Sequence, residues 1–130
     1  MQKAILLLGH GSSLPNANET MRQIIGEIQG HYPGYQTGCV FLETEKPSIT
    51  DGIEAAVEKG ARYVMLIPYF LQAGKHVVTD IPTIVKQEQE KHPDVKIVVA
   101  PHLGFDEALV KVVLERIRQV DDLGIISNYE

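Results

Sequence analysis

The stretch AILLLGHGSS, residues 4–13, contains five apolar residues in a row and then turns abruptly polar. An apolar run that does not alternate with polar residues is typical of a strand covered on both faces, as in a parallel sheet. Similar valine-, isoleucine- or leucine-rich runs recur at 38–42, 63–67 and 95–100. The sequence therefore predicts four buried strands of one sheet.

Segments with helical spacing lie between and after these runs. The apolar residues on one predicted face are Ala17, Met21, Ile24, Ile25 and Ile28 in the first segment, Ile49, Ile53, Ala56 and Val57 in the second, and Leu109, Val113 and Ile117 in the last. Asp80 and Pro82 predict the N-cap and first turn of the third helix, which His92-Pro93 would end. Alternating strands and helices predict an α/β fold with right-handed crossovers and helices on both faces of the sheet. We expect one domain over residues 1–120 and a tail over residues 121–130.

Composition limits the classes of partner. The chain has 130 residues, one cysteine and a formal net charge of −5. It contains no basic run, so we expect no nucleic-acid partner. Its apolar runs are far shorter than the roughly 20 residues of a membrane span, and no signal-peptide pattern follows the first one. These features favour a cytoplasmic protein with no membrane partner.

The residues that follow each predicted strand are the functional candidates, because ligands bind at the carboxyl ends of strands in open parallel sheets. His10, Ser12 and Ser13 follow the first strand, and Glu43 follows the second. The third strand is followed by Tyr69, Phe70 and Leu71 and then by Lys75 and His76, and the fourth is followed by His102. Chemistry-bearing residues thus gather at one predicted edge.

Each candidate also has a purely structural interpretation. His10 is either a polar turn residue or a group that binds a metal, moves a proton or acts as a nucleophile. Ser12 and Ser13 are candidates to cap the next helix, whose N-terminus would favour an anionic ligand. Tyr69 and Phe70 suit a core or a cleft wall. The remaining histidines, His31 and His92, lie beside prolines at predicted helix ends and are expected to be solvated.

His10 and His76 are 66 positions apart, so only the fold can bring them together. They become neighbours if the first and third strands are adjacent, as in the strand order 2-1-3-4, and Glu43 would then flank the same crevice. Two imidazoles and one carboxylate suit iron, cobalt, nickel or zinc, and they leave coordination positions open for a second ligand.

The ordered set of these motifs resembles the small class II tetrapyrrole chelatases, the CbiX or SirB family of sirohydrochlorin chelatases. The matching motifs are Gly9-His10-Gly11-Ser12, Phe41-Leu42-Glu43 with Pro47 after it, Pro68 to Leu71, Gly74-Lys75-His76-Val77, Asp80-Ile81-Pro82 and Leu103-Gly104. The resemblance runs from the first strand to the last helix. It implies a chelatase-like three-layer sandwich with a four-stranded parallel sheet.

The resemblance also implies an activity. It is the insertion of a divalent metal, Co²⁺, Fe²⁺ or Ni²⁺, into sirohydrochlorin, an octacarboxylate tetrapyrrole on the way to sirohaem and cobalamin. His10 and His76 would bind the incoming metal with Glu43 assisting. Ser12, Ser13, Lys75 and the wall of Tyr69, Phe70 and Leu71, together with Leu14, would meet the macrocycle. The metal is a substrate, no tightly bound cofactor is expected, and short chains of this family pair as homodimers.

Two rivals remain at this point. A histidine after the first strand also occurs in phosphohistidine hydrolases, but those need an arginine where this chain has Gly9. A non-catalytic carrier of metal or tetrapyrrole would use the same His10, His76 and Glu43, because a carrier and a chelatase both need exposed, reversible ligands. Lys75, Lys46 and Arg22 are candidates to attract an anionic substrate to this net negative protein.

Overall fold

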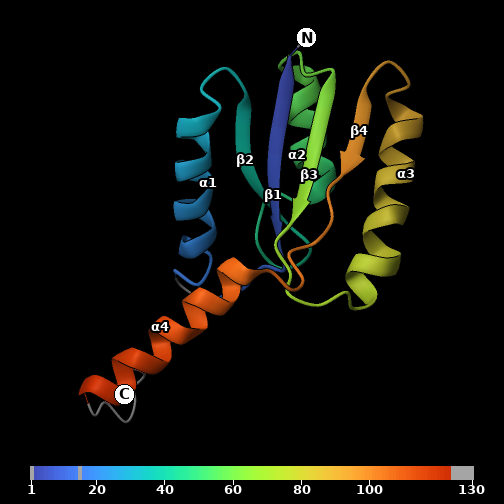
Figure 1. Ribbon diagram of the computed structural model, residues 1–130. Coiled ribbons are helices and arrows are strands. Elements are labelled where there is room, and N and C mark those ends of the chain that lie inside the picture. The colour runs from blue at the N-terminus through green and yellow to red at the C-terminus, as the bar shows by residue number, and fades with distance from the viewer. Residues whose placement is uncertain (1, 15, 124–130) are drawn as a thin grey trace.

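The computed structural model describes residues 2–14 and 16–123, with the backbone alone at His76 and Leu123. Its centre is a parallel sheet in the order β2-β1-β3-β4, which confirms the predicted order (Figure 1). The strands are β1 (Lys3–Gly9), β2 (Gln36–Phe41), β3 (Tyr63–Pro68) and β4 (Lys96–Val99). In the register of the sheet, Leu6 of β1 lies between Gly38 of β2 and Leu66 of β3. Central β1 is buried from Ala4 to Gly9, which explains its unbroken apolar run.

Helices cover both faces of this sheet. They are α1 (Glu19–His31), α2 (Ile49–Glu58), α3 (Ile81–Lys91) and α4 (Glu107–Leu123), with a π-helical turn η1 (His76–Asp80) before α3. One face packs α2 and α3 against Leu6, Leu8 and their neighbours. The opposite face packs Met21 of α1 against Leu7 and Phe41. The predicted layers of helix, sheet and helix are therefore present.

Helix α2 begins with a side-chain cap and packs very close to the sheet. The Oγ atom of Ser48 accepts a hydrogen bond from the backbone N–H of Asp51 at 3.1 Å. Gly52 faces Val40 so closely that a Cβ atom at residue 52 would lie 2.2 Å from Val40 Cγ1. A glycine inside this helix costs some helix propensity, but it allows the helix backbone to approach β2.

Two predicted helix caps are wrong. Ser12 and Ser13 do not cap α1, because the helix begins only at Glu19, with Asn18 in the N-cap position. Asp80 does not cap α3, because its backbone is already helical (φ −71°, ψ −45°) and its side chain makes no capping hydrogen bond. The reason is that η1 leads directly into α3, so the chain has no free helix N-terminus at Asp80.

Helix α4 projects away from the sheet instead of packing on either face (Figure 1). Asp106 Oδ1 accepts a hydrogen bond from the N–H of Ala108 at 2.8 Å, which supports its predicted role at the start of this helix. The helix continues through Leu123, past the predicted boundary at residue 120, and residues 124–130 of the predicted tail lie outside the described residues. Within the part of the chain that the structure describes, no helix is long and apolar enough to cross a membrane.

Candidate active site

The Gly-His-Gly segment after β1 is shaped by close backbone contacts. A Cβ atom at residue 9 would lie 2.9 Å from Met21 Cε, so Gly9 allows α1 to pack tightly against the end of β1. Gly11 has φ +97°, a left-handed conformation, and a Cβ atom there would lie 1.9 Å from the carbonyl oxygen of Glu43. Residue 11 therefore needs glycine for steric reasons, whereas the contact at residue 9 is with the flexible end of the Met21 side chain, which can shift. The histidine between them is held at the carboxyl edge of the sheet.

Backbone hydrogen bonds continue beyond the ends of β1 and β2 and bring His10 beside Glu43. The N–H of Leu42 donates to Gly9 O at 3.1 Å, and the N–H of Glu43 donates to His10 O at 2.9 Å. The side chains then meet, with 3.4 Å between His10 Nε2 and Glu43 Oε2. They are 52% and 53% exposed. This pair is open to solvent, so a metal ion or an exchangeable proton has access to it.

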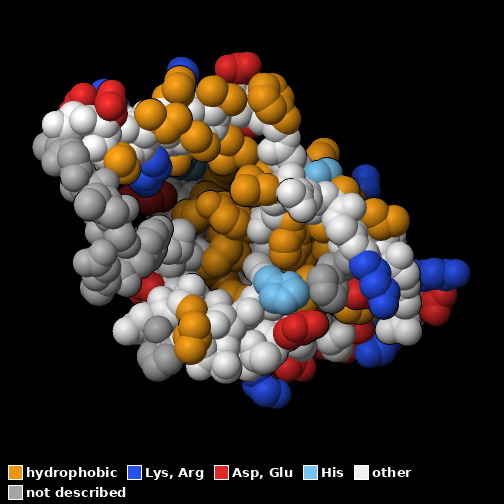
Figure 2. Space-filling model, turned by 90° about the horizontal axis from the view of Figure 1, so that it is seen from below, with side chains coloured by type: hydrophobic (Ala, Val, Ile, Leu, Met, Phe, Trp, Pro, Cys, Tyr) orange, Lys and Arg blue, Asp and Glu red, His pale blue; other side chains and the backbone are white. Residues whose placement is uncertain are grey.

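An apolar cleft of about 450 Å³ opens beside His10. Its lining consists of His10, Tyr69, Phe70, Leu71, Gln72, Gly74 and Val77. The N–H of Tyr69 donates to Leu8 O at 2.8 Å, and the N–H of Leu103 donates to Phe70 O at 3.0 Å. These bonds fix the segment after β3 between β1 and the loop after β4. Figure 2 shows hydrophobic side chains around a hollow at this end of the molecule.

His76 is placed by its backbone only. It is the first residue of η1, which follows the cleft-lining segment after β3. The backbone N–H groups of Val77 and Val78 donate to Gly74 O at 3.1 and 3.0 Å, and Val77 lines the cleft. The side chain of His76 lies outside the described residues. The meeting of two imidazoles thus stays a prediction, although the strand order on which it depends is confirmed.

The other predicted substrate contacts differ in their settings. Ser12 Oγ accepts a hydrogen bond from the N–H of Leu14 at 3.1 Å, so Ser12 shapes its own turn. Ser13 and Lys75 are exposed on loops after β1 and β3. Leu14 is 69% exposed and is not among the residues that line the cleft, contrary to the predicted wall. His102 is half-buried.

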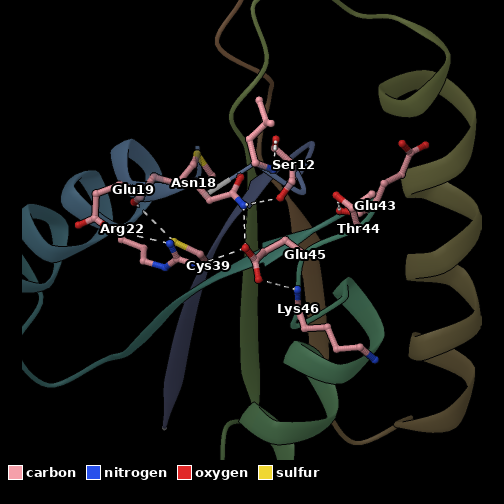
Figure 3. A network of polar contacts seen from close by, with 11 residues as sticks. Ser12, Asn18, Glu19, Arg22, Cys39, Glu43, Thr44, Glu45 and Lys46 are labelled. Atoms are coloured by element: carbon pink, nitrogen blue, oxygen red, sulfur yellow. Dashed lines mark hydrogen bonds and ion pairs between the residues drawn. The ribbon is translucent and has the colours of Figure 1, made fainter. Parts of the chain in front are cut away.

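A polar network joins the loop after β1 to the loop after β2 (Figure 3). Glu45 accepts hydrogen bonds from Asn18 Nδ2 at 2.8 Å and from the N–H of Lys46 at 3.2 Å, and it lies 3.5 Å from Arg22 Nη2. The hydrogen bond from Asn18, then that from Lys46, and the charge of Arg22 lower the pKa of the Glu45 carboxyl. Asn18 Nδ2 also donates to Ser12 O at 3.1 Å.

This network gives Arg22 two acidic neighbours and adds residues that the sequence did not reveal. Arg22 Nη2 lies 3.5 Å from Glu45 and Arg22 Nη1 lies 3.8 Å from Glu19, so both carboxylates offset part of its charge, and its role in attracting substrate stays a prediction. Asn18 is 6% exposed. Asn18 and Glu45 are 27 positions apart, and no local sequence pattern predicts their contact. Val77 lines the cleft but reads in the sequence as an ordinary apolar residue.

His92 also departs from its prediction as a solvated helix end. Its side chain is only 20% exposed, and its Nε2 atom lies 2.5 Å from Glu54 Oε2 of α2. His31, at the end of α1, is exposed as predicted. The proline beside each histidine marks the helix end correctly, but it gives no information about what the neighbouring helix places opposite.

Comparison with known proteins gives consistent matches. The CbiX family model matches residues 4–120. A sirohydrochlorin ferrochelatase of Bacillus subtilis (strain 168) is 31% identical over 96% of this chain, which spans 47% of that protein. A sirohydrochlorin cobaltochelatase of Sulfolobus acidocaldarius is also 31% identical, over 86% of this chain and 87% of its own length.

A solved structure shows the same fold. The crystal structure of the sirohydrochlorin chelatase SirB from Bacillus subtilis subspecies spizizenii in complex with cobalt has a TM-score of 0.85 and 30% identity, over 92% of this chain and 51% of that one. The chain therefore spans about half the length of the Bacillus relatives. It covers most of the length of the Sulfolobus protein.

Proposed function

Because this chain belongs to the CbiX family, we propose that it inserts a divalent metal ion into sirohydrochlorin. The observation that carries the proposal is the solvent-open pair of His10 and Glu43 at the mouth of an apolar cleft. A flat macrocycle suits the apolar wall, and a metal ion suits the imidazole and carboxylate. The relatives named above include both a ferrochelatase and a cobaltochelatase, so we propose Co²⁺ or Fe²⁺ as the metal substrate.

The chemistry requires a metal donor and a proton acceptor on the same side of the ring. Two pyrrole N–H protons leave the free macrocycle as the metal enters. In our proposal His10 and His76 hold the incoming metal, and Glu43 balances its charge or accepts a proton. Neutral imidazole suits this task, because its usual pKa of about 6.5 leaves the ring nitrogen free to bind metal near pH 7. Exposed, incomplete ligation lets the metal leave again.

The cleft wall and the loops around it would orient the macrocycle. Tyr69 and Phe70 offer apolar surface beside His10. Lys75 is exposed on the loop just before His76, where its ammonium group would attract substrate carboxylates. Ser12 and Ser13 would add hydrogen-bonding groups on the opposite loop. In this arrangement, the apolar wall supplies contact area and the loops supply charge.

The test is a metal-insertion assay with purified protein, sirohydrochlorin and Co²⁺, in which the change in absorbance reports the rate. We expect acceleration over the protein-free rate, and we expect His10→Ala to abolish most of it. His31→Ala is the matched control, because His31 is an exposed histidine at the end of α1, on an element that does not line the cleft. Tight binding of both substrates without acceleration would contradict the proposal and favour the carrier. Equal activity of His10→Ala and His31→Ala would contradict the proposed site.

A second variant separates attraction of the substrate from chemistry. Lys75→Glu reverses one charge at the cleft and should raise KM more than it lowers kcat. The effect should shrink as salt is added, because the charge is exposed and therefore screened. Equal losses in kcat and in kcat/KM, with unchanged KM, would argue against a role in binding carboxylates.

We further propose that the protein acts as a homodimer in which a second copy covers α4. The apolar residues Val112, Val113, Leu114, Ile117 and Val120 of this helix are between 48% and 58% exposed. Such a continuous apolar surface on a helix is costly to leave in water. Sedimentation velocity should show a dimer for the natural sequence and a monomer for the double variant Val113→Asp, Ile117→Asp. A monomer in both samples would refute the dimer and leave the chelatase proposal intact.

The pathway and location of the protein stay predictions. The metallated product would serve sirohaem or cobalamin synthesis, and the protein would work in the cytoplasm without a tightly bound cofactor. Loss of either end product in a deletion strain, restored by the natural sequence but not by His10→Ala, would identify the pathway.

A further inference from the structure

A second group of metal-ligating side chains lies far from the cleft, between α2 and α3. Glu54 comes from α2, Glu88 from α3, and His92 from the residue at which α3 ends. One ligand atom from each lies within 4.8 Å of the other two. His10 lies at the carboxyl edge of the sheet, whereas α3 ends toward the amino edge (Figure 1). The group is therefore separate from the proposed active site.

Ion pairs account for only part of this group. His92 Nε2 lies 2.5 Å from Glu54 Oε2, and Lys91 Nζ lies 3.0 Å from Glu88 Oε2. The second oxygen of Glu88, Oε1, is buried and has no hydrogen-bond partner among the described residues. The Glu88 side chain is only 1% exposed. A buried carboxylate oxygen without a partner carries a desolvation penalty that the single contact with Lys91 does not remove.

We propose that Glu54, Glu88 and His92 form a second site for a divalent cation. Glu88 and His92 are four positions apart, so they share one face at the end of α3, and Glu54 faces them from α2. Two carboxylates and one imidazole suit Zn²⁺, Co²⁺, Ni²⁺ or Fe²⁺. The three ligand atoms already lie within 4.8 Å of one another, so in this proposal a cation would draw them together by side-chain rotation. A bound cation would remove the penalty on Glu88 and connect α2 to α3.

Lys91 is the competitor for this site. Its ammonium group lies 3.0 Å from Glu88 and 3.9 Å from Glu54, where it holds the carboxylates together in the absence of a cation. Its side chain is 55% exposed and flexible, so it can move into solvent when a cation binds. The proposal therefore predicts opposite effects for removing the histidine and removing the lysine.

The test is equilibrium dialysis with Co²⁺ or Zn²⁺ in the His10→Ala background, which removes a proposed ligand of the active site. We expect one divalent ion to remain bound, and His92→Asn to weaken its binding about tenfold or more. His31→Asn is the matched control and should leave binding unchanged. Unchanged binding in His92→Asn would overturn the proposal. In the His10-containing protein, His92→Asn should retain chelatase activity, since His92 is remote from the cleft.

Lys91→Gln keeps the test decisive even if His92→Asn folds poorly. If the group is a cation site, removing the competing ammonium should tighten Zn²⁺ binding several-fold and increase the rise of Tm on adding Zn²⁺. If the group is only an ion-pair cluster, Lys91→Gln should lower Tm and leave Zn²⁺ binding as it was, which would overturn the proposal. Zn²⁺-dependent Tm is independent of sirohydrochlorin, so failure here is distinguishable from failure of the proposed activity.

Discussion

Helices α2 and α4 have the same kind of sequence and opposite surroundings. Both are amphipathic and both begin at a side-chain cap, Ser48 for α2 and Asp106 for α4. Helix α2 buries Ile49, Gly52, Ile53 and Ala56 against the sheet. In the described part of α4, every residue is half-buried or exposed. The periodicity of a helix thus indicates which face is apolar, but not which surface covers it.

Truncation of one isoleucine in each helix should give the largest difference in stability between α2 and α4. Ile53 is fully buried, so Ile53→Ala should lower the free energy of unfolding by about 2–5 kcal/mol. Ile117 is 57% exposed, so Ile117→Ala should change it by less than about 0.5 kcal/mol in the monomer. Urea denaturation at a low protein concentration measures both. Similar losses would mean that α4 packs on its own domain in solution.

The dependence of Tm on protein concentration is a second way to distinguish a helix covered by its own domain from one covered by a second copy. If a second copy covers α4, dimer formation adds stability by mass action, and Tm should rise with protein concentration. The rise should disappear in the double variant Val113→Asp, Ile117→Asp, whereas Ile53→Val should lower Tm by a similar amount at every concentration. Differential scanning fluorimetry over a wide concentration range provides the measurement. A concentration-independent Tm of the natural sequence would contradict a dimer formed through α4.

The helix caps should give the smallest difference. Ser48→Ala removes the hydrogen bond to Asp51 and should cost about 1 kcal/mol of global stability, because α2 folds with the sheet. Asp106→Ala should affect only the first turn of α4, since that helix makes few contacts with the body. Hydrogen exchange should show faster exchange of Ala108 and its neighbours alone. A global loss in Asp106→Ala would show that α4 is part of the cooperative unit.

The sequence was sufficient for the sheet because each strand carries an apolar run, although only β1 is buried along almost its whole length and β4 buries Ile97 alone. Apolar runs place the strands, and the structure confirms the predicted order 2-1-3-4, the order in which the strands before His10 and His76 are neighbours. The caps were missed for a local reason. A serine after a strand or an aspartate before a proline has the right chemistry for a cap. However, Ser12 accepts a hydrogen bond from Leu14 within its own loop, and the π-helical turn His76–Asp80 leads straight into α3.

The candidate site was predicted in part. His10 and Glu43 follow neighbouring strands, so the topology alone brings them to one edge. The contacts of Glu45 with Asn18 and of His92 with Glu54 join residues 27 and 38 positions apart through side-chain geometry. Such contacts have no signature in a single sequence, because loop conformation and helix rotation decide them.

Gly11 sets a limit on how this protein could be redesigned. A combinatorial library aimed at another metal could vary Glu43 or the aromatic residues of the cleft without altering the path of the main chain. It has to keep residue 11 as glycine, because any side chain there would collide with the backbone carbonyl oxygen of Glu43. Moving that backbone would also move the side-chain carboxylate of Glu43 away from His10. The smallest residue of the site is therefore the one with the least freedom to change.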